Sequence, residues 1–237
     1  GLNIAIKSLV RPGSTVVISG YEHNAVTRPL HAIPNVTVRV AESSLFDRER
    51  AVEAFRNAIT PEVSAVVCCH VSNVFGFILP VEEIARVCRE RRVPLIVDAS
   101  QSAGCVPLDM EALGAAYLAM PGHKGLYGPQ GTGLLLCGET VPQPLLEGGT
   151  GSASLVQTMP DFLPDRLEAG THNVTGIAGL LEGRRFVRRT GVENIGRRES
   201  MLIRRLAAGL ERIPGITLFR ARDPRAQAGV LSLQVDG

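Results

Sequence analysis

Residues 63–98 read VSAVVCCHVSNVFGFILPVEEIARVCRERRVPLIVD. The stretch opens with a continuous apolar run over 63–69 and closes with a second one over 95–97, and both have the length of buried strands. Residues 81–92 lie between them and have the spacing of a helix that is apolar on one face. Strands that are apolar throughout and are joined by a helix are typical of parallel sheets. The stretch therefore predicts an α/β fold.

The same alternation extends to both sides of this unit. Further strands are predicted at 15–19, 36–40, 116–120 and 132–136, and further helices at 2–10, 26–32 and 47–58. Residues 140–164 are rich in Pro, Gly, Ser and Thr and predict a long excursion without regular structure. Helices at 175–189 and 192–213 follow, with strands at 216–219 and 230–235. We expect a large domain over 1–185 whose N-terminal part is missing, and the beginning of a small, incomplete C-terminal α+β domain over 186–237.

Composition and charge exclude several classes of protein. Hydrophobic residues make up 45% of the chain and charged residues 20%, as in globular proteins, and the net charge is only +2. The arginines are densest over 184–205, where acids are interleaved, so we expect a solvated helix and no nucleic-acid partner. No apolar run approaches the roughly 20 residues of a membrane span, so we expect no membrane association.

The five cysteines indicate a reducing compartment and hence a cytoplasmic protein. Their number is odd and their spacing matches no disulfide framework. Cys68, Cys69 and His70 are adjacent on a predicted strand, where alternate side chains point to opposite faces. They make a poor metal site, and we expect no metal.

Polar side chains follow four of the predicted strands at the point where each strand ends. They are His23, Asn73, Asp98, Gln101, His123 and Lys124. Taken singly, each is explained as a loop residue or a helix cap. In parallel sheets, however, ligands bind beyond the carboxyl ends of the strands. We therefore expect these six residues to converge on one site.

Lys124 is one of only two lysines among 25 basic residues, the others being arginine. A surface charge is the plain interpretation, but a desolvated lysine can lose its proton and attack a carbonyl, which arginine cannot do. Asp98 follows the apolar run Pro-Leu-Ile-Val, where a carboxylate needs a cationic partner, although it also suits a helix N-cap. A lysine imine and a carboxylate at a ring nitrogen are what pyridoxal phosphate requires. The pair predicts that cofactor.

Five blocks resemble the class V aminotransferase superfamily, and within it most closely the cysteine desulfurase and selenocysteine lyase branch. They are YEHNAV (21–26), HVSNVFG (70–76), VDASQSAG (97–104), PGHKGLYGPQGTG (121–133) and RLEAGTHN (166–173). Together they cover nearly the whole chain in the family's order. The resemblance implies a pyridoxal-phosphate-dependent transferase of fold type I, with a mostly parallel seven-stranded sheet, flanking helices and truncation at both ends.

By position, the resemblance assigns three residues to the cofactor ring. Lys124 would carry the cofactor as a Schiff base and later move the Cα proton of the substrate. Asp98 would pair with the pyridine nitrogen, and His23 would stack on the ring.

The remaining roles concern the cofactor's oxygen atoms and a second subunit. Asn73 and Gln101 would approach the phenolic oxygen, and His123 would contact the phosphate. Thr171 would reach the phosphate bound by the partner subunit, which implies a homodimer. The glycine-rich residues 148–152 would border the same partner site.

The sequence departs from the family pattern at Pro121, where relatives often have a serine that donates to the phosphate. The family's N-terminal phosphate-binding threonine would lie before Gly1. The nucleophilic cysteine of a desulfurase and the arginine that binds the substrate carboxylate would lie beyond Gly237.

The resemblance implies an enzyme that acts on a small L-amino acid, foremost a cysteine desulfurase that converts L-cysteine to L-alanine and passes persulfide sulfur to an acceptor protein. A class V aminotransferase or a related lyase would use every visible residue in the same way. A catalytically incomplete fragment or a non-catalytic partner is an alternative of another kind. A nicotinamide dehydrogenase is disfavoured, because no Gly-x-Gly-x-x-Gly follows the first strand.

Overall fold

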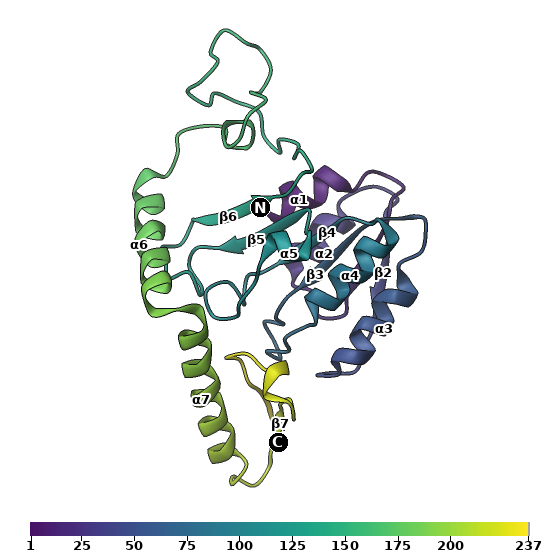
Figure 1. Ribbon diagram of the computed structural model, residues 1–237, viewed down its shortest axis with the longest axis vertical. Coiled ribbons are helices and arrows are strands. Elements are labelled where there is room, and N and C mark those ends of the chain that lie inside the picture. Colours follow the sequence, from purple (N-terminus) through teal and green to yellow (C-terminus); the bar gives the residue numbers. More distant parts are fainter. Residues whose placement is uncertain (237) are drawn as a thin grey trace.

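A computed structural model describes residues 1–236 as a twisted sheet with helices on both faces, continued by two long helices along one side (Figure 1). The strands are β1 (Thr15–Ser19), β2 (Thr37–Ala41), β3 (Val63–Cys69), β4 (Leu95–Asp98), β5 (Tyr117–Pro121) and β6 (Gly133–Cys137). Their spatial order is β2-β1-β3-β4-β5-β6. Five strands run parallel and β6 pairs antiparallel with β5. The α/β, mostly parallel sheet is confirmed.

The expected number of strands is corrected. The described residues form a six-stranded main sheet, where seven strands were expected. The other two strands, β7 (Ile216–Phe219) and β8 (Ser232–Val235), pair antiparallel in a sheet of their own.

The core lies in two layers because successive residues of a buried strand point to opposite faces. Val17, Val66 and Val97 pack on one face with α3 (Arg48–Ala58) and α4 (Val81–Arg91). Val16, Val67 and Ile96 pack on the other with α1 (Leu2–Leu9) and α2 (Asn24–His31). The central strands are covered on both faces, which fixes the positions of their ends.

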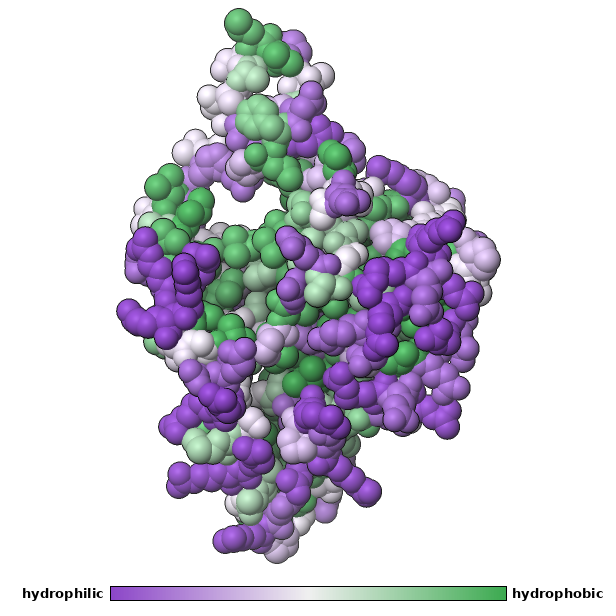
Figure 2. All heavy atoms as spheres, viewed as in Figure 1, coloured by the Kyte–Doolittle hydropathy of each residue, from purple (hydrophilic) through white to green (hydrophobic). Residues whose placement is uncertain are grey.

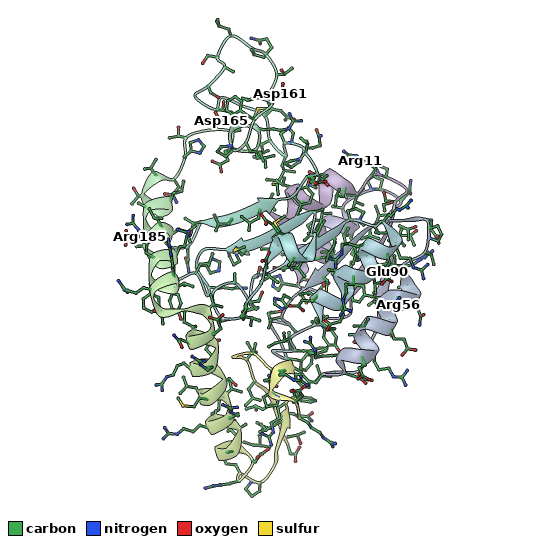
Figure 3. The ribbon with its side chains drawn as sticks, in the orientation of Figure 1. Arg11, Arg56, Glu90, Asp161, Asp165 and Arg185 are labelled. Carbon is green, nitrogen blue, oxygen red and sulfur yellow. The ribbon has the colours of Figure 1, made fainter. Side chains whose placement is uncertain are left out.

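Surface ion pairs add little to this frame. Arg56 of α3 lies 3.1 Å from Glu90 of α4, and both side chains are about half exposed (Figure 3). Exposed pairs of this kind contribute about 0–1 kcal/mol. The position of α3 against α4 therefore depends on the apolar core.

Two long helices follow the sheet, α6 (Val174–Thr190) and α7 (Val192–Leu210). Asn173 caps α6 through a hydrogen bond from the Gly176 N–H, 3.0 Å long. Beyond α7, the side-chain amide of Gln227 donates to the Phe75 carbonyl at 2.9 Å, joining the β7–β8 unit to the loop after β3. The predicted domain boundary at 185/186 falls inside α6, and the division into two domains stays a prediction.

Residues 140–170, called here the arm, project from the body and contain only a short turn of 3₁₀ helix, Asp165–Leu167 (Figure 1). Arg166 holds the base of the arm by donating from Nε to the Pro142 carbonyl at 2.9 Å. Apolar side chains gather at its tip (Figure 2). Within the arm, Leu155 is 97% exposed and Leu146 70%. Large apolar side chains that are exposed to water indicate an interaction surface.

Among the described residues, no helix has both the length and the apolar character needed to cross a membrane. Within the same residues, no three His, Cys, Asp or Glu side chains are grouped as a metal site would need. The five cysteines are all free thiols.

Candidate functional site

Six of the predicted site residues lie at one edge of the sheet. His23 follows β1, Asn73 follows β3, Asp98 ends β4 and Lys124 follows β5. Because β1, β3, β4 and β5 are parallel neighbours in that order, their carboxyl ends meet. Gln101 and His123 are in the same two connections as Asp98 and Lys124. The topology thus brings the connections that carry these six residues to one edge, and their convergence on a single site stays a prediction.

Asp98 is the buried acid of this edge. The residue pairs in register with Cys69 of β3 on one side and Ala119 of β5 on the other, and it is only 4% exposed. Oδ1 accepts a hydrogen bond from the Ser100 N–H at 2.9 Å, which closes a turn, and the alternative of a helix N-cap is wrong because no helix begins there. No ion pair to Asp98 occurs within residues 1–236. A buried carboxylate without a cation calls for one from outside.

Lys124 lies in a turn that glycine residues hold close to Asp98's own loop. The Tyr127 N–H closes the turn on the Lys124 carbonyl at 2.9 Å. A Cβ on Gly104, whose φ is +92°, would lie 1.9 Å from the carbonyl oxygen of Gly125. Only glycine permits this approach of two backbones. The segment that follows Asp98 therefore touches the residue that follows Lys124.

The side chain of Lys124 is exposed, and it forms no ion pair in the part of the chain that is described. The sequence predicts a desolvated amine for Lys124, but the described residues alone do not bury it. The amine is instead free to react with a molecule that enters from the solvent side.

His23 forms the start of α2 and is oriented by it. Its Nδ1 accepts a hydrogen bond from the Ala25 N–H at 3.0 Å, which leaves Nε2 to carry the proton of the neutral ring. The imidazole is exposed and faces no acid in the described ion pairs. A ring fixed at one nitrogen can present its face to a planar ligand.

Glu22 is a site residue that the sequence argument missed. Its Oε1 accepts hydrogen bonds from the Ser19 hydroxyl at 2.6 Å and from the Cys69 N–H at 2.7 Å. These bonds attach the loop after β1 to the end of β3 and so fix the position of His23. Burial, with a smaller contribution from the charge of Asp98, raises the pKa of Glu22 to about 7. The only signal in the sequence was its place beside His23 in the block YEHNAV.

The other predicted residues differ in their surroundings. Asn73 and His123 are exposed, whereas Gln101 is partly buried. Gln101 and Gly125 line a cavity of about 250 Å³ that α7 closes with Glu199. Thr171 is exposed and lies in the segment before α6, where the preceding Gly170 N–H donates to the Gly149 carbonyl at 2.7 Å.

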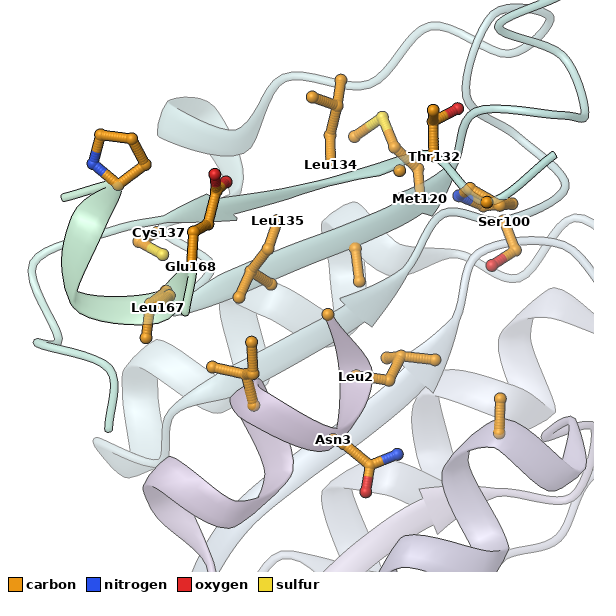
Figure 4. A pocket seen from close by; sticks show the side chains of 18 of the residues that line it. Leu2, Asn3, Ser100, Met120, Thr132, Leu134, Leu135, Cys137, Leu167 and Glu168 are labelled. Atoms are coloured by element: carbon orange, nitrogen blue, oxygen red, sulfur yellow. The ribbon is translucent and has the colours of Figure 1, made fainter. Parts of the chain in front are cut away.

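A larger cavity of about 590 Å³ adjoins the site (Figure 4). Residues next to the predicted ones line it, namely Ala25, Ser100 and Pro121, together with the first turn of α1. The free N–H groups of a helix N-terminus favour an anion. The first turn of α1 therefore offers N–H donors to an anion in this cavity, which Glu168 also lines, and the predicted site residues lie outside its lining.

Helix α6 presses on the lysine loop through a glycine face, a second feature that the sequence argument missed. Gly176, Gly179 and Gly183 recur at helical spacing, and a Cβ on Gly183 would lie 2.2 Å from the Leu126 carbonyl oxygen. A Cβ on Gly176 would lie 2.8 Å from the Thr132 methyl group. The spacing itself was the signal that could have shown this contact.

A model of the family described as Aminotransferase class-V matches residues 1–237. The chain belongs to this family. It is 34% identical over 236 residues to a probable cysteine desulfurase of Xylella fastidiosa, with 96% of this chain and 56% of that protein covered. Members of the family thus include proteins named as desulfurases.

Solved structures of family relatives share the fold. The apo structure of a cysteine desulfurase from Thermococcus onnurineus NA1 has a TM-score of 0.87 and 30% identity, and the match covers all of this chain and 61% of that one. Two structures of C-DES have TM-scores of 0.83 and 0.82 at 25% and 26% identity, covering 99% of this chain and 65% of theirs. One is a mutant with glycine covalently linked to the PLP cofactor, and the other is a cystine C-S lyase with its reaction product cysteine persulfide. The chain therefore spans a little over half the length of the curated relative, and less than two thirds of each of these structures.

Proposed function

We propose that this chain forms the cofactor-binding part of a pyridoxal-phosphate enzyme that acts on a small L-amino acid, foremost as a cysteine desulfurase. The reaction would convert L-cysteine to L-alanine and leave its sulfur as a persulfide for an acceptor protein. The observation that carries the proposal is the presence of two complementary side chains at neighbouring strand ends. Asp98 is buried and has no ion-pair partner among the described residues, and the amine of Lys124 is exposed and has none there either. Relatives named as desulfurases support the same conclusion.

The residues present fit this cofactor. Asp98 supplies a buried negative charge for a protonated ring nitrogen, and His23 supplies a ring fixed for stacking. The N–H groups of the first turn of α1 would donate to a phosphate in the cavity beside it. His123 would approach this phosphate from the turn that follows β5. Pro121 lines that cavity without a hydroxyl or an N–H group to donate, so the serine contact of relatives is lost there.

Each residue then has a definite task. The cofactor, when bound, supplies an electron sink for the bond that breaks at the substrate Cα. Lys124 would hold the cofactor aldehyde through its amine and later accept the Cα proton at Nζ. Asp98 would keep the ring nitrogen protonated, while Asn73 and Gln101 would orient the phenolic oxygen.

Four of the five cysteines are buried and do not suit the part of sulfur acceptor. Cys68 and Cys69 are buried, and burial raises the pKa of both thiols well above the usual value. Burial raises the pKa of Cys88 and Cys105 to about 12. A thiolate, not a thiol, is the nucleophile, so these groups are inert at neutral pH.

A cystine C–S lyase is the second candidate function, and the likeness of this chain to C-DES supports it. In such a reaction the sulfur leaves on the small-molecule product, as the cysteine persulfide bound to C-DES illustrates. The reaction therefore requires no protein thiol. A class V aminotransferase would use the same visible residues, and a non-catalytic role predicts no bound cofactor at all.

We further propose a homodimer in the cytoplasm, with Thr171 contributing to the partner's phosphate site. The exposed apolar side chains of the arm and the position of Thr171 at its base support this assembly. The glycine-rich residues 148–152 would border the same partner site. Five free thiols are compatible with a reducing compartment.

The decisive experiment uses the only two lysines of the chain as a matched pair. After incubation with pyridoxal phosphate and borohydride, peptide mass spectrometry should find the cofactor fixed on Lys124 and not on Lys7. Lys124→Arg should lose fixation and turnover although it keeps the charge, whereas Lys7→Arg should retain both. Fixation on Lys7, or turnover in the Lys124→Arg variant, would contradict the proposal.

Product analysis of the coloured protein separates the candidate reactions. Alanine formed from L-cysteine indicates a desulfurase, and pyruvate formed from cystine indicates the lyase. Transfer of the amino group to a keto acid indicates the aminotransferase. A protein that stays colourless would support the non-catalytic alternative and overturn the proposal.

A further inference from the structure

The carboxyl group of Glu22 is buried at the site, and the proposed function gives it no task. Oε1 has two donors, Ser19 and Cys69, but Oε2 is buried without a hydrogen-bond partner among the described residues. A buried carboxylate with one oxygen unpaired carries a large desolvation penalty. The same group in its protonated form carries no charge, and Oε2 can then hold the proton. The local geometry therefore favours a neutral Glu22.

Glu22 also stands beside Asp98. It accepts from the backbone N–H of Cys69, the residue that pairs directly with Asp98 across β3 and β4. The negative charge of Asp98 is one of the causes that raise the pKa of Glu22, after burial. Two carboxyl groups that share a poorly solvated site resist ionising together.

The other titratable groups at Glu22 do not supply a compensating charge. From β3 they are the thiols of Cys68 and Cys69, whose pKa values burial raises well above the usual value, so both thiols stay neutral. From β4 the group is Asp98 itself. Ser19 of β1 contributes a hydroxyl, which is neutral. Neither the thiols nor the hydroxyl supplies a positive charge that would stabilise an ionised Glu22.

We propose that Glu22 is a positioning residue that keeps one proton beside Asp98, so that the two carboxyl groups present a single negative charge to the ring nitrogen of the bound cofactor. The proposal rests on the proposed function, because the ring nitrogen enters through it. Glu22 touches neither cofactor nor substrate in this account; it acts through Asp98, while its bonds to Ser19 and Cys69 hold the His23 loop.

Carbon-13 NMR of the cofactor-free protein, labelled at the glutamate side-chain carboxyl carbon, tests the first half of this proposal. One glutamate resonance should titrate near pH 7. It should vanish in Glu22→Gln and persist in Glu193→Gln, which removes an exposed glutamate of α7. If every glutamate titrates near the ordinary value of 4.5, the proposal is overturned.

Two further titrations test the coupling to Asp98, and they do not depend on the folding of Glu22 variants. In Asp98→Asn, the Glu22 midpoint should fall, because the neighbouring negative charge is gone. In wild-type protein loaded with pyridoxal phosphate, it should also fall, because the protonated ring nitrogen adds a positive charge. An unchanged midpoint in either case overturns the coupling.

The loaded sample also separates this inference from the proposed function. Borohydride fixation on Lys124 reports cofactor binding independently of Glu22. A fixed cofactor with an unchanged Glu22 midpoint refutes the role of Glu22 alone. If the Glu22 resonance titrates near 7 but the protein never binds the cofactor, the proposed function and the link to the ring nitrogen are both refuted. Only the conclusion that Glu22 is a buried, protonated acid then remains.

Discussion

At the scale of single residues, two buried titratable groups act on stability with opposite signs. Burial, and then the charge of Arg48, lowers the pKa of His70 from 6.5 to about 4. Its Nδ1 is buried without a partner among the described residues, so the folded state holds the ring neutral. Below pH 6.5 the histidine binds a proton in the unfolded chain but not in the folded chain, so the protein loses stability as pH falls toward 4. The pKa of Glu22 is raised instead, so the stability that this group contributes at low pH is lost as pH rises from 4.5 to about 7.

We therefore expect His70→Gln to change the pH profile of unfolding in the cofactor-free protein. The free energy of unfolding of wild type minus that of the variant should rise between pH 4 and 6.5 by at most about 3 kcal/mol. Urea denaturation at a series of pH values measures this difference. His31→Gln, at an exposed histidine of α2, serves as the control and should leave the profile unchanged. Parallel profiles for wild type and His70→Gln would show that the folded protein does not hold this ring neutral.

At the scale of elements, the contact of α6 with the lysine loop depends on missing side chains. Glycine inside a helix is less favourable than alanine by about 0.5–1 kcal/mol, so replacing it normally stabilises. At Gly183 the added Cβ would lie 2.2 Å from a backbone carbonyl, which cannot move out of the way as a side chain can. The clash outweighs the helix propensity and reverses the sign.

Gly183→Ala is expected to destabilise the protein by about 1–3 kcal/mol, and to weaken cofactor retention because α6 supports the Lys124 turn. Gly209→Ala in α7 is the matched control, because a Cβ there meets nothing within 4 Å. It should stabilise by about 0.5–1 kcal/mol. Thermal unfolding separates the two, since 1 kcal/mol shifts Tm by about 2–4 °C in a chain of this size. Equal shifts of Tm in the two variants would contradict the close packing of α6.

At the scale of the whole molecule, the apolar arm is the feature that a second subunit would explain. Leu146 and Leu155 are among its most exposed side chains. Burial of a leucine side chain contributes about 1.5–3 kcal/mol, and a tenfold change in affinity corresponds to 1.4 kcal/mol. Burial of one such leucine is therefore enough to change the affinity of self-association about tenfold or more.

We expect Leu155→Ser to weaken self-association about tenfold or more, measured by sedimentation at several concentrations. Val40→Ser, at an exposed valine of the opposite edge strand β2, is the control and should leave association unchanged. A wild-type protein that sediments as a monomer would remove the homodimer proposal. A dimer that Leu155→Ser leaves intact would exclude the arm from its interface.

The sequence by itself determined the order of strands and helices, the strand ends that carry Asp98 and Lys124, and the family. These features follow from local patterns: apolar runs define buried strands, and the chain reverses where polar and glycine residues follow them. The short helix Met110–Leu113 went unpredicted because four residues are too few to show a period.

Only the tertiary structure decided the rest. The burial of Glu22 arises from a bond to Cys69, 47 residues away, and the neutral His70 from packing between distant elements. The close fit of α6 and the open position of Lys124 likewise depend on segments that meet only in the folded chain. Local patterns state which residues prefer an apolar environment, but the solvation and charge of one polar atom are fixed by every segment packed around it.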